Sequence, residues 1–370
     1  MSEPSVLVTG ATGYLGRHLL RALCAQGASS AVLVREASGW GAQPWRREAG
    51  EVAVVAGHPL DVERWRTHPA LPKVRTIFHT AGIVSHSRSA PDEMLKLNVE
   101  GTLQMVHLAH SLDARLVFIS SSGTVGCFPF KDMSADEDSP YAEPTVSGWP
   151  YYVSKIRAER DARRLAEHLG VELVIVRPPV LLGPDDHRHR STAYVKKVLD
   201  SKIPAVPRGG MNFTDVRDVS SALARLVDLE RPRPVYHVPG HNMSLREFFD
   251  TVIEVSGARP IRRPMPPWAA RGLAKVAGLS DRRPSWIPDP VVLEMSNFYW
   301  GITSLHAHEL GYAPRSARQT LSDTVSWLRS GQAPALPHAV VSQAMAPQGA
   351  APHAMAKASP LERAQTSPDM

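Results

Sequence analysis

Residues 5–16 constrain the fold of this 370-residue chain more than any other segment, because they combine a strand, a tight turn and the start of a helix. An apolar run breaks at Gly10, and leucines then recur at helical spacing. Gly10 permits the turn, Gly13 lets the backbone approach a pyrophosphate, and Gly16 lets the helix pack on the strand. The helix N-terminus adds free amide donors. The segment therefore predicts a dinucleotide-binding turn.

Strand-like and helix-like segments alternate from residue 5 to about residue 182. The strand-like runs are residues 5–9, 31–35, 52–55, 74–79, 115–120 and 171–177. This alternation is typical of a parallel sheet built from βαβ units. We predict an α/β fold in which residues 1–182 form a doubly wound, Rossmann-type sheet. Beyond it, residues 191–201, 215–230, 244–256 and 318–329 have helical patterns.

The composition favours a globular protein without membrane spans. Hydrophobic residues make up 43% and charged residues 21%, and no apolar run reaches the ~20 residues that cross a bilayer. The first strand begins too early to leave room for a secretion signal, so we expect a cytoplasmic protein. Two cysteines, Cys24 and Cys127, are too few for a disulfide framework or a metal site. We expect no metal.

The formal net charge of +6 raises the question of nucleic acid. The basic residues are dispersed over separate elements without interleaved aromatics, which favours solvated faces or cofactor phosphate contacts over a nucleic-acid site. Residues 333–370 are rich in Ala, Pro, His, Gln and Ser and lack aromatic residues, so we expect a disordered tail. His338 and His353 within it lack the spacing of metal ligands.

A tyrosine and a lysine lie one helical turn apart just after Pro150, which suits the first turn of a helix. Tyr151 and Lys155 share a helix face, so the ammonium can favour the phenolate and lower a phenol pKa that starts at about 10. Alone, such a pair is usually two surface side chains. Beside a dinucleotide-binding turn, it makes Tyr151 a candidate proton donor and acceptor.

Two motifs carry a family resemblance: Thr-Gly-Ala-Thr-Gly-Tyr-Leu-Gly at 9–16 and Tyr-Tyr-Val-Ser-Lys at 151–155. Together they resemble the extended short-chain dehydrogenase/reductase family over most of residues 5–330. Other agreeing segments are His79–Gly82, Asn98–Thr102, Ser120–Ser122, Val176–Val180 with Gly183-Pro184, and Asn212–Asp218. The serine loop and the Arg177 motif look more like dihydroflavonol reductases and 3β-hydroxysteroid dehydrogenases than like nucleotide-sugar epimerases.

The resemblance implies an enzyme in which Tyr151 transfers a proton and a serine hydroxyl holds the substrate oxygen. Matching the serine loop to such reductases places the catalytic serine at Ser121, with Ser122 next in line. Lys155 is implied to bind the nicotinamide ribose as well. Asn98 matches an active-site asparagine of the family, although a helix cap explains it almost equally well.

The resemblance also implies contacts to a dinucleotide cofactor. The residues expected to make them are Gly10, Thr12, Gly13, Tyr14, Leu15, Gly16, Arg35, Thr80, Ala81, Gly82, Asn98, Tyr151, Lys155 and Pro178. After the second strand, Arg35 favours a cofactor with a 2′-phosphate. The following Glu36 leaves the cofactor without that phosphate as an alternative. Arg17 supplies a second cation. We therefore favour NADP(H) over NAD(H). His58 stands where the family often has an Asp for the adenine, which leaves that contact in doubt.

The substrate prediction depends on the segment after the sixth strand and on the later aromatics. In the family, residues 183–332 mainly form a smaller C-terminal substrate lobe, with some segments returning to the core. Arg177 is followed by Pro-Pro-Val rather than by the tyrosine and asparagine usual in nucleotide-sugar enzymes. The lobe contains Trp268, Trp286, Phe298, Tyr299 and Trp300, which are pocket or core residues. Both features favour a bulky, largely apolar small molecule.

The main hypothesis is an NAD(P)-dependent oxidoreductase that interconverts a ketone and a secondary alcohol. The first alternative is a nucleotide-sugar epimerase or dehydratase with bound NAD. The second is a dinucleotide-binding sensor or assembly protein without turnover, which the intact Tyr151, Lys155 and serine loop argue against. We expect no nucleic-acid partner and no stable membrane insertion. The sequence does not decide whether residues 268–279 make weak contact with a membrane surface or whether the protein forms a homodimer.

Overall fold

The centre of the fold is a seven-stranded parallel sheet with the strand order β10-β6-β5-β4-β1-β2-β3. The computed structural model describes residues 3–88, 91–277 and 288–331. The strands are β1 (Val6–Thr9), β2 (Ser30–Val34), β3 (Val52–Ala56), β4 (Thr76–His79), β5 (Arg115–Ile119), β6 (Leu173–Arg177) and β10 (Val235–His237). The predicted Rossmann-type sheet is confirmed, with β10 added at its edge from beyond residue 182.

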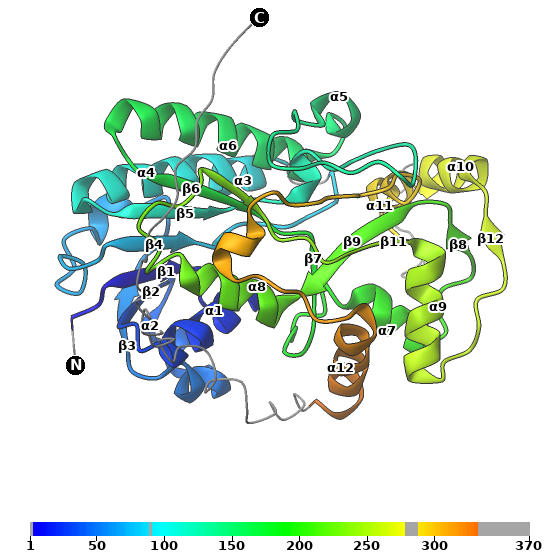
Figure 1. Cartoon of the computed structure of the whole chain (residues 1–370), viewed down its shortest axis with the longest axis horizontal. Coiled ribbons are helices and arrows are strands. Elements are labelled where there is room, and N and C mark those ends of the chain that lie inside the picture. The colour runs from blue at the N-terminus through cyan, green and yellow to red at the C-terminus, as the bar shows by residue number, and fades with distance from the viewer. Residues whose placement is uncertain (1–2, 89–90, 278–287, 332–370) are drawn as a thin grey trace, which may run out of the picture. The chain divides into compact units, whose positions relative to one another are not determined.

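Helices cover both faces of this sheet. Helices α1 (Tyr14–Ala25) and α8 (Val216–Arg225) pack on one face, and α4 (Gly101–Leu112) and α6 (Pro150–Leu169) pack on the other (Figure 1). The apolar run of β1 follows from this layering, because Val6 and Val8 enter the first layer whereas Leu7 enters the second, and all three are fully buried. The shorter helices of this half are α2 (Ala37–Gly41), α3 (Pro91–Leu95) and α5 (Glu143–Val146).

The strand order reverses between β1 and β4. From β1 the chain passes outward to β2 and β3, and it then returns to β4 on the other side of β1. Thr9, the last residue of β1, pairs with Leu33 of β2 and with His79 of β4. The carboxyl ends of these strands therefore meet at one edge, where open α/β sheets bind their ligands.

A smaller lobe follows the sixth strand and gathers at one end of the sheet (Figure 1). Its strands form one three-stranded sheet, β11-β9-β7, and one two-stranded sheet, β12-β8. They are β7 (Val180–Leu182), β8 (Val206–Pro207), β9 (Gly210–Asp215), β11 (His241–Ser244) and β12 (Pro264–Met265). The helices are α7 (Ala193–Leu199), α9 (Leu245–Ser256), α10 (Pro267–Ala277), α11 (Pro290–Met295) and α12 (Ala317–Ser330). The four predicted helical segments thus correspond to α7, α8, α9 and α12.

Residues Met1–Pro334 form one compact unit that contains both the sheet and the lobe. The boundary placed at residue 182 stays a prediction. The expected tail, 333–370, and Trp286 lie outside the described residues. Among the helices of the described ranges, none combines the length and apolarity needed to cross a bilayer.

Candidate active site

The glycine turn after β1 joins the ends of β1 and β4. Gly10 has φ 71°, and a Cβ atom there would lie 2.6 Å from the amide nitrogen of Ala81. The Thr80 hydroxyl donates to the Thr9 carbonyl at 2.7 Å, and the Ala81 amide donates to the Thr9 hydroxyl at 3.3 Å. A Cβ atom at Gly16 would collide with the Gly10 carbonyl. The predicted cofactor residues that follow β1 and β4 therefore lie side by side. A side chain larger than that of glycine at position 10 or 16 would collide with the neighbouring backbone.

Helix α1 follows Gly13, which provides no side-chain cap, and its first turn has no acidic residue, so no side chain neutralises the positive end of the helix dipole, which favours an anion. Beside it, the hydroxyl of Tyr14 and two guanidinium nitrogens of Arg17, Nε and Nη1, are buried and lack hydrogen-bond partners among the described residues. The Arg17 guanidinium lies 5.0 Å from the Trp45 ring, and burial lowers its pKa. These orphaned donors fit a phosphate-bearing dinucleotide.

Arg35 and Glu36 follow β2 directly, and both side chains are exposed. Because Leu33 pairs with Thr9, Arg35 emerges at the same edge as the glycine turn. The cation that was predicted to contact a 2′-phosphate is thus close in the fold to the start of α1. The acidic alternative, Glu36, is the residue that precedes α2.

Lys155 lies deep in the site on α6. Its ammonium donates to the Ile119 carbonyl at 2.8 Å and lies 4.8 Å from the Phe118 ring. It is also 3.7 Å from the position that a Cβ atom of Gly82 would occupy. Burial lowers the pKa of Lys155 to about 8. The helix thus carries the predicted Tyr-Lys pair to the edge that bears the glycine turn.

Tyr151 is buried one turn earlier, in edge-to-face contact with the His86 ring at 5.6 Å and the Tyr152 ring at 5.1 Å. Burial raises the pKa of Tyr151 to about 12, and this effect outweighs a hydrogen bond from Ser121 that lowers it. The prediction that Lys155 lowers this pKa is therefore wrong for this structure. The cause is desolvation of the buried phenol. Tyr151 is a neutral phenol at physiological pH.

The three serines of the loop, Ser120–Ser122, make different contacts. The Ser120 hydroxyl donates to Glu159 at 2.5 Å. Ser121 lies within hydrogen-bonding reach of Tyr151, and its oxygen also accepts from the Gly123 amide at 3.3 Å. Ser122 is buried, and its amide donates to the Pro178 carbonyl at 3.0 Å. The structure thus places Ser121, the predicted catalytic serine, beside the phenol.

Asn98 lies in a π-helical turn, Lys96–Glu100, between α3 and α4. Its side-chain oxygen accepts from the Ile83 amide at 2.8 Å, and its nitrogen donates to the Ile83 carbonyl and to the Ser154 hydroxyl, both at 3.0 Å. The helix-cap alternative is wrong, because Asn98 lies inside this turn and caps neither flanking helix. Its side chain instead ties the segment after Gly82 to α6.

Sequence reasoning missed a buried ion pair behind the serine loop. Glu159 and Arg177 have 0% and 4% of their side-chain surfaces exposed, and their closest atoms are 2.6 Å apart. Glu159 also accepts from the Ser120 hydroxyl and from the Tyr141 hydroxyl, the latter at 3.0 Å. Burial opposes ionisation of Glu159, but Arg177 and the Ser120 hydrogen bond outweigh it and hold its pKa below the usual range. Glu159 lies one helical turn after Lys155, but this spacing does not indicate Arg177 of β6 as its partner.

The sequence analysis also assigned no role to the imidazole of His79, which is buried in the site. Its Nδ1 is 2.8 Å from the Thr9 hydroxyl, and its buried Nε2 lacks a partner among the described residues. Burial, with the Lys155 cation as a second cause, lowers its pKa to about 3. His79 is therefore neutral beside the lysine.

Aromatic side chains form one wall of the site. Trp300 stacks on Tyr152 at 4.9 Å, and Trp149 contacts Trp300 at 5.6 Å and Phe298 at 5.4 Å. Of the predicted lobe aromatics, Trp300 thus contacts α6 at Tyr152, and Phe298 contacts Trp149 just before this helix. The other two that are described do not: Tyr299 donates to the Arg208 carbonyl, and Trp268 is exposed.

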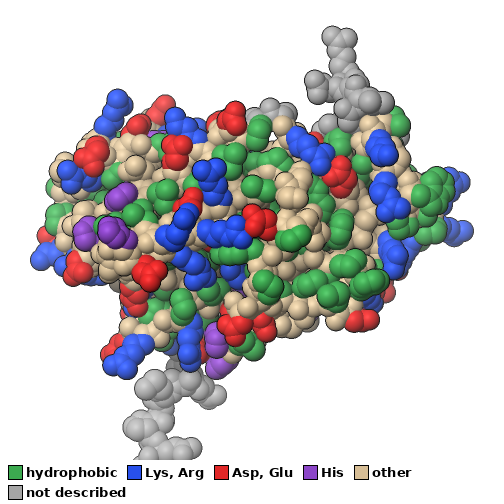
Figure 2. Space-filling view, turned by 90° about the horizontal axis from the view of Figure 1, so that it is seen from above, with side chains coloured by type: hydrophobic (Ala, Val, Ile, Leu, Met, Phe, Trp, Pro, Cys, Tyr) green, Lys and Arg blue, Asp and Glu red, His purple; other side chains and the backbone are tan. Residues whose placement is uncertain are grey.

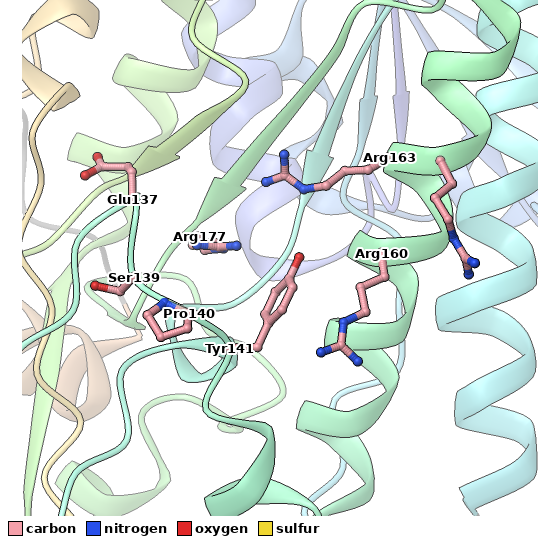
Figure 3. A pocket seen from close by; sticks show the side chains of 8 residues that line it. Glu137, Ser139, Pro140, Tyr141, Arg160, Arg163 and Arg177 are labelled. Carbon is pink, nitrogen blue, oxygen red and sulfur yellow. The ribbon is translucent and has the colours of Figure 1, made fainter.

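A cavity of about 590 Å³ is lined in part by Arg177 of the buried ion pair and by Tyr141, whose hydroxyl donates to Glu159 (Figure 3). Its lining residues are Glu137, Ser139, Pro140, Tyr141, Arg160, Arg163, Arg164 and Arg177. Figure 3 shows Tyr141 between Arg177 and Arg160, whose guanidinium carbons are 5.5 and 5.0 Å from its ring. None of the predicted catalytic residues lines this cavity.

Comparison with known proteins agrees with this geometry. Residues 6–238 match the NAD dependent epimerase/dehydratase family. Sterol demethylase protein B of Methylococcus capsulatus is 28% identical over 88% of this chain and 98% of its own length. A Synechocystis protein provisionally named dihydroflavonol 4-reductase is 28% identical over 87% of this chain and 94% of its own length.

Solved structures show the same architecture. The crystal structure of gox2253 has a TM-score of 0.74 at 28% identity and covers 89% of this chain and 99% of its own. The UDP-glucose 4-epimerase of Thermus thermophilus, in complex with NAD, has a TM-score of 0.65 at 22% identity over 88% and 99% of the two chains, which shows the fold alone. The protein belongs to the NAD-dependent epimerase/dehydratase family and is an NAD(P)-binding enzyme of the oxidoreductase type.

Proposed function

We propose that this enzyme uses NADPH to reduce a ketone to a secondary alcohol on a bulky, largely apolar small molecule. The observation that carries the proposal is the arrangement of Tyr151, Ser121 and Lys155. A neutral phenol lies beside a serine hydroxyl, on the helix whose lysine reaches the Gly82 edge. This is the donor set that a carbonyl needs when it gains negative charge.

The residues of the chain have separate tasks in this reaction. The cofactor, when bound, supplies the hydride. Ser121 donates a hydrogen bond to the substrate oxygen, and Tyr151 gives that oxygen its proton. With a pKa of about 12, Tyr151 holds this proton throughout the physiological range. The Lys155 ammonium, held by the Ile119 carbonyl near Gly82, would bind the ribose hydroxyls of the cofactor.

Two observations support an apolar substrate. The wall next to Tyr151 is built from Trp149, Tyr152, Phe298 and Trp300. Arg177 is neutralised by Glu159 behind the serine loop, so this guanidinium is not a free cation for the diphosphate of a nucleotide sugar. The names of the two relatives, a sterol protein and a flavonoid reductase, agree with this substrate class.

The preference for NADPH is supported by the cations around the start of α1. Arg35 is exposed at the end of β2, and Arg17 is buried with two guanidinium nitrogens that lack partners among the described residues. A 2′-phosphate would pair with such groups, and charge-assisted hydrogen bonds of this kind are the strong ones.

A cofactor-oxidation screen tests the proposal. Purified enzyme is mixed with NADPH or NADH and with ketones graded in size and polarity, with Tyr151→Phe as the matched control. We expect NADPH oxidation by large apolar ketones, with kcat lowered by ~10²–10⁴ in the control while NADPH binding persists. A protein that arrives with tightly held NAD, oxidises no NADPH and interconverts nucleotide sugars would establish the epimerase alternative instead.

A further inference from the structure

Helix α10 exposes an unusual amount of apolar surface on one face. Ala270, Ala274 and Ala277 are buried against the protein. On the opposite side, Trp268 is 73% exposed and Val276 is 65% exposed, the highest values for large hydrophobic side chains in the described part of the chain. Positions 268, 272 and 276 follow one line along a helix because they are four residues apart.

Cations accompany this apolar line. Arg271 and Lys275 are exposed on the same helix, and Arg259, Arg262 and Arg263 are exposed just before it. The sequence has no acidic residue between Glu254 and Asp281. Figure 2 shows hydrophobic side chains projecting at the end of the molecule where α10 lies, with Lys and Arg side chains next to them. The acids on neighbouring α11 are engaged, since Glu294 pairs with Arg88 and Asp289 caps the helix.

We propose that this face of α10 binds the surface of a membrane that contains anionic phospholipids. Tryptophan favours the headgroup level because its ring is apolar and its N–H is polar, and each nearby Lys or Arg adds attraction to anionic lipid. Helix α10 has 11 residues, so it lies along the interface and does not cross it. Its buried alanines keep it attached to the protein while its outer face contacts lipid.

The location of α10 gives this contact a use. The helix packs on α11, whose Val291 and Met295 belong to the same cluster as Trp149, Tyr152 and Tyr151. The proposed lipid-binding face is therefore separated from the proton donor by one short helix and an aromatic wall. An apolar substrate dissolved in a bilayer would be close to the site, a benefit that rests on the proposed function, whereas the binding itself does not.

Vesicle co-sedimentation without substrate or cofactor tests the surface. The vesicles are phosphatidylcholine alone, or with about a third of phosphatidylglycerol as the anionic lipid. Two variants change the surface, Trp268→Ser and the double variant Arg271→Glu with Lys275→Glu. Two matched controls lie elsewhere: Leu305→Ser removes another exposed apolar side chain, and Arg225→Glu with Arg231→Glu makes the same change in net charge.

We expect wild type and both controls to bind the anionic vesicles, less so in high salt, and each α10 variant to bind at least about tenfold more weakly. Thermal melting checks that the variants are folded. Wild type that stays in the supernatant, or α10 variants that bind like their controls, would overturn the proposal. If wild type instead dimerises through Trp268, the face is a protein interface and the lipid proposal is wrong. Ketone reduction in detergent-free solution is measured separately, so a failure of the proposed reaction cannot be mistaken for a failure of lipid binding.

Discussion

Replacing Glu159 by glutamine is expected to lower the free energy of unfolding by about 3–5 kcal/mol, the usual effect of removing one partner of a buried ion pair. Arg177 would keep its charge in a site where only 4% of its side chain is exposed. The upper part of the range applies because Glu159 also accepts from Ser120 and Tyr141. Urea unfolding followed by tryptophan fluorescence gives the difference.

The controls separate burial from charge. Glu63→Gln breaks the exposed pair with Arg66, whose atoms are 2.7 Å apart, and exposed pairs contribute only about 0–1 kcal/mol. The double variant Glu159→Leu with Arg177→Met should recover most of the loss, because it leaves no unpaired buried charge. A Glu159→Gln loss no larger than that of Glu63→Gln would refute the reasoning.

Acid provides a second check on the same carboxylate. The pKa of Glu159 is lowered in the folded protein, so its contribution to stability is present above the ordinary glutamate pKa. It is lost as the pH falls through the folded pKa. The stability difference between wild type and Glu159→Gln should therefore shrink on acidification, and a difference that stays constant down to acid unfolding would contradict the assignment.

Three further predictions concern the site itself. Ser121→Ala should lower kcat by ~10²–10³, as removal of an oxyanion donor does, whereas Ser122→Ala should stay within a few-fold of wild type; equal losses would show that the serine assignment is wrong. Arg35→Ala and Arg17→Met should each weaken NADPH binding by ~10-fold or more in a fluorescence titration while leaving NADH unchanged, and a parallel loss for both cofactors would exclude 2′-phosphate contacts. For the free enzyme, kcat/KM should fall as the pH rises through about 8, where Lys155 loses its proton, and this limb should move to higher pH in Lys155→Arg; a limb that stays in place belongs to another group.

The parts of the fold that could be predicted were encoded over short distances. The glycine turn lies between an apolar strand and a helix within residues 5–16, and Tyr151 and Lys155 are one turn apart. Spacing alone therefore placed these groups on the correct elements. The edge strand β10 has only three residues, too few to show a pattern.

The unpredicted parts depend on contacts between distant segments. In the sequence, Glu159 resembles any acidic residue of an amphipathic helix, and only the packing of α6 on β6 brings it to Arg177. The raised pKa of Tyr151 arises from burial in a site where the rings of His86 and Tyr152 contact it, and His86 comes from a distant part of the chain. Such desolvation depends on the complete fold. The expectation that the nearby Lys155 cation lowers the pKa of Tyr151 therefore had the wrong direction.

The hydrogen bonds of Asn98 have a consequence for how an enzyme of this kind can change. One carboxamide holds both the strand extension at Ile83 and the helix residue Ser154, whose hydroxyl in turn donates to the Tyr151 carbonyl at 2.6 Å. All of these groups belong to the sheet half. The smaller lobe can therefore be reshaped without breaking the hydrogen bonds that hold the backbone at Tyr151.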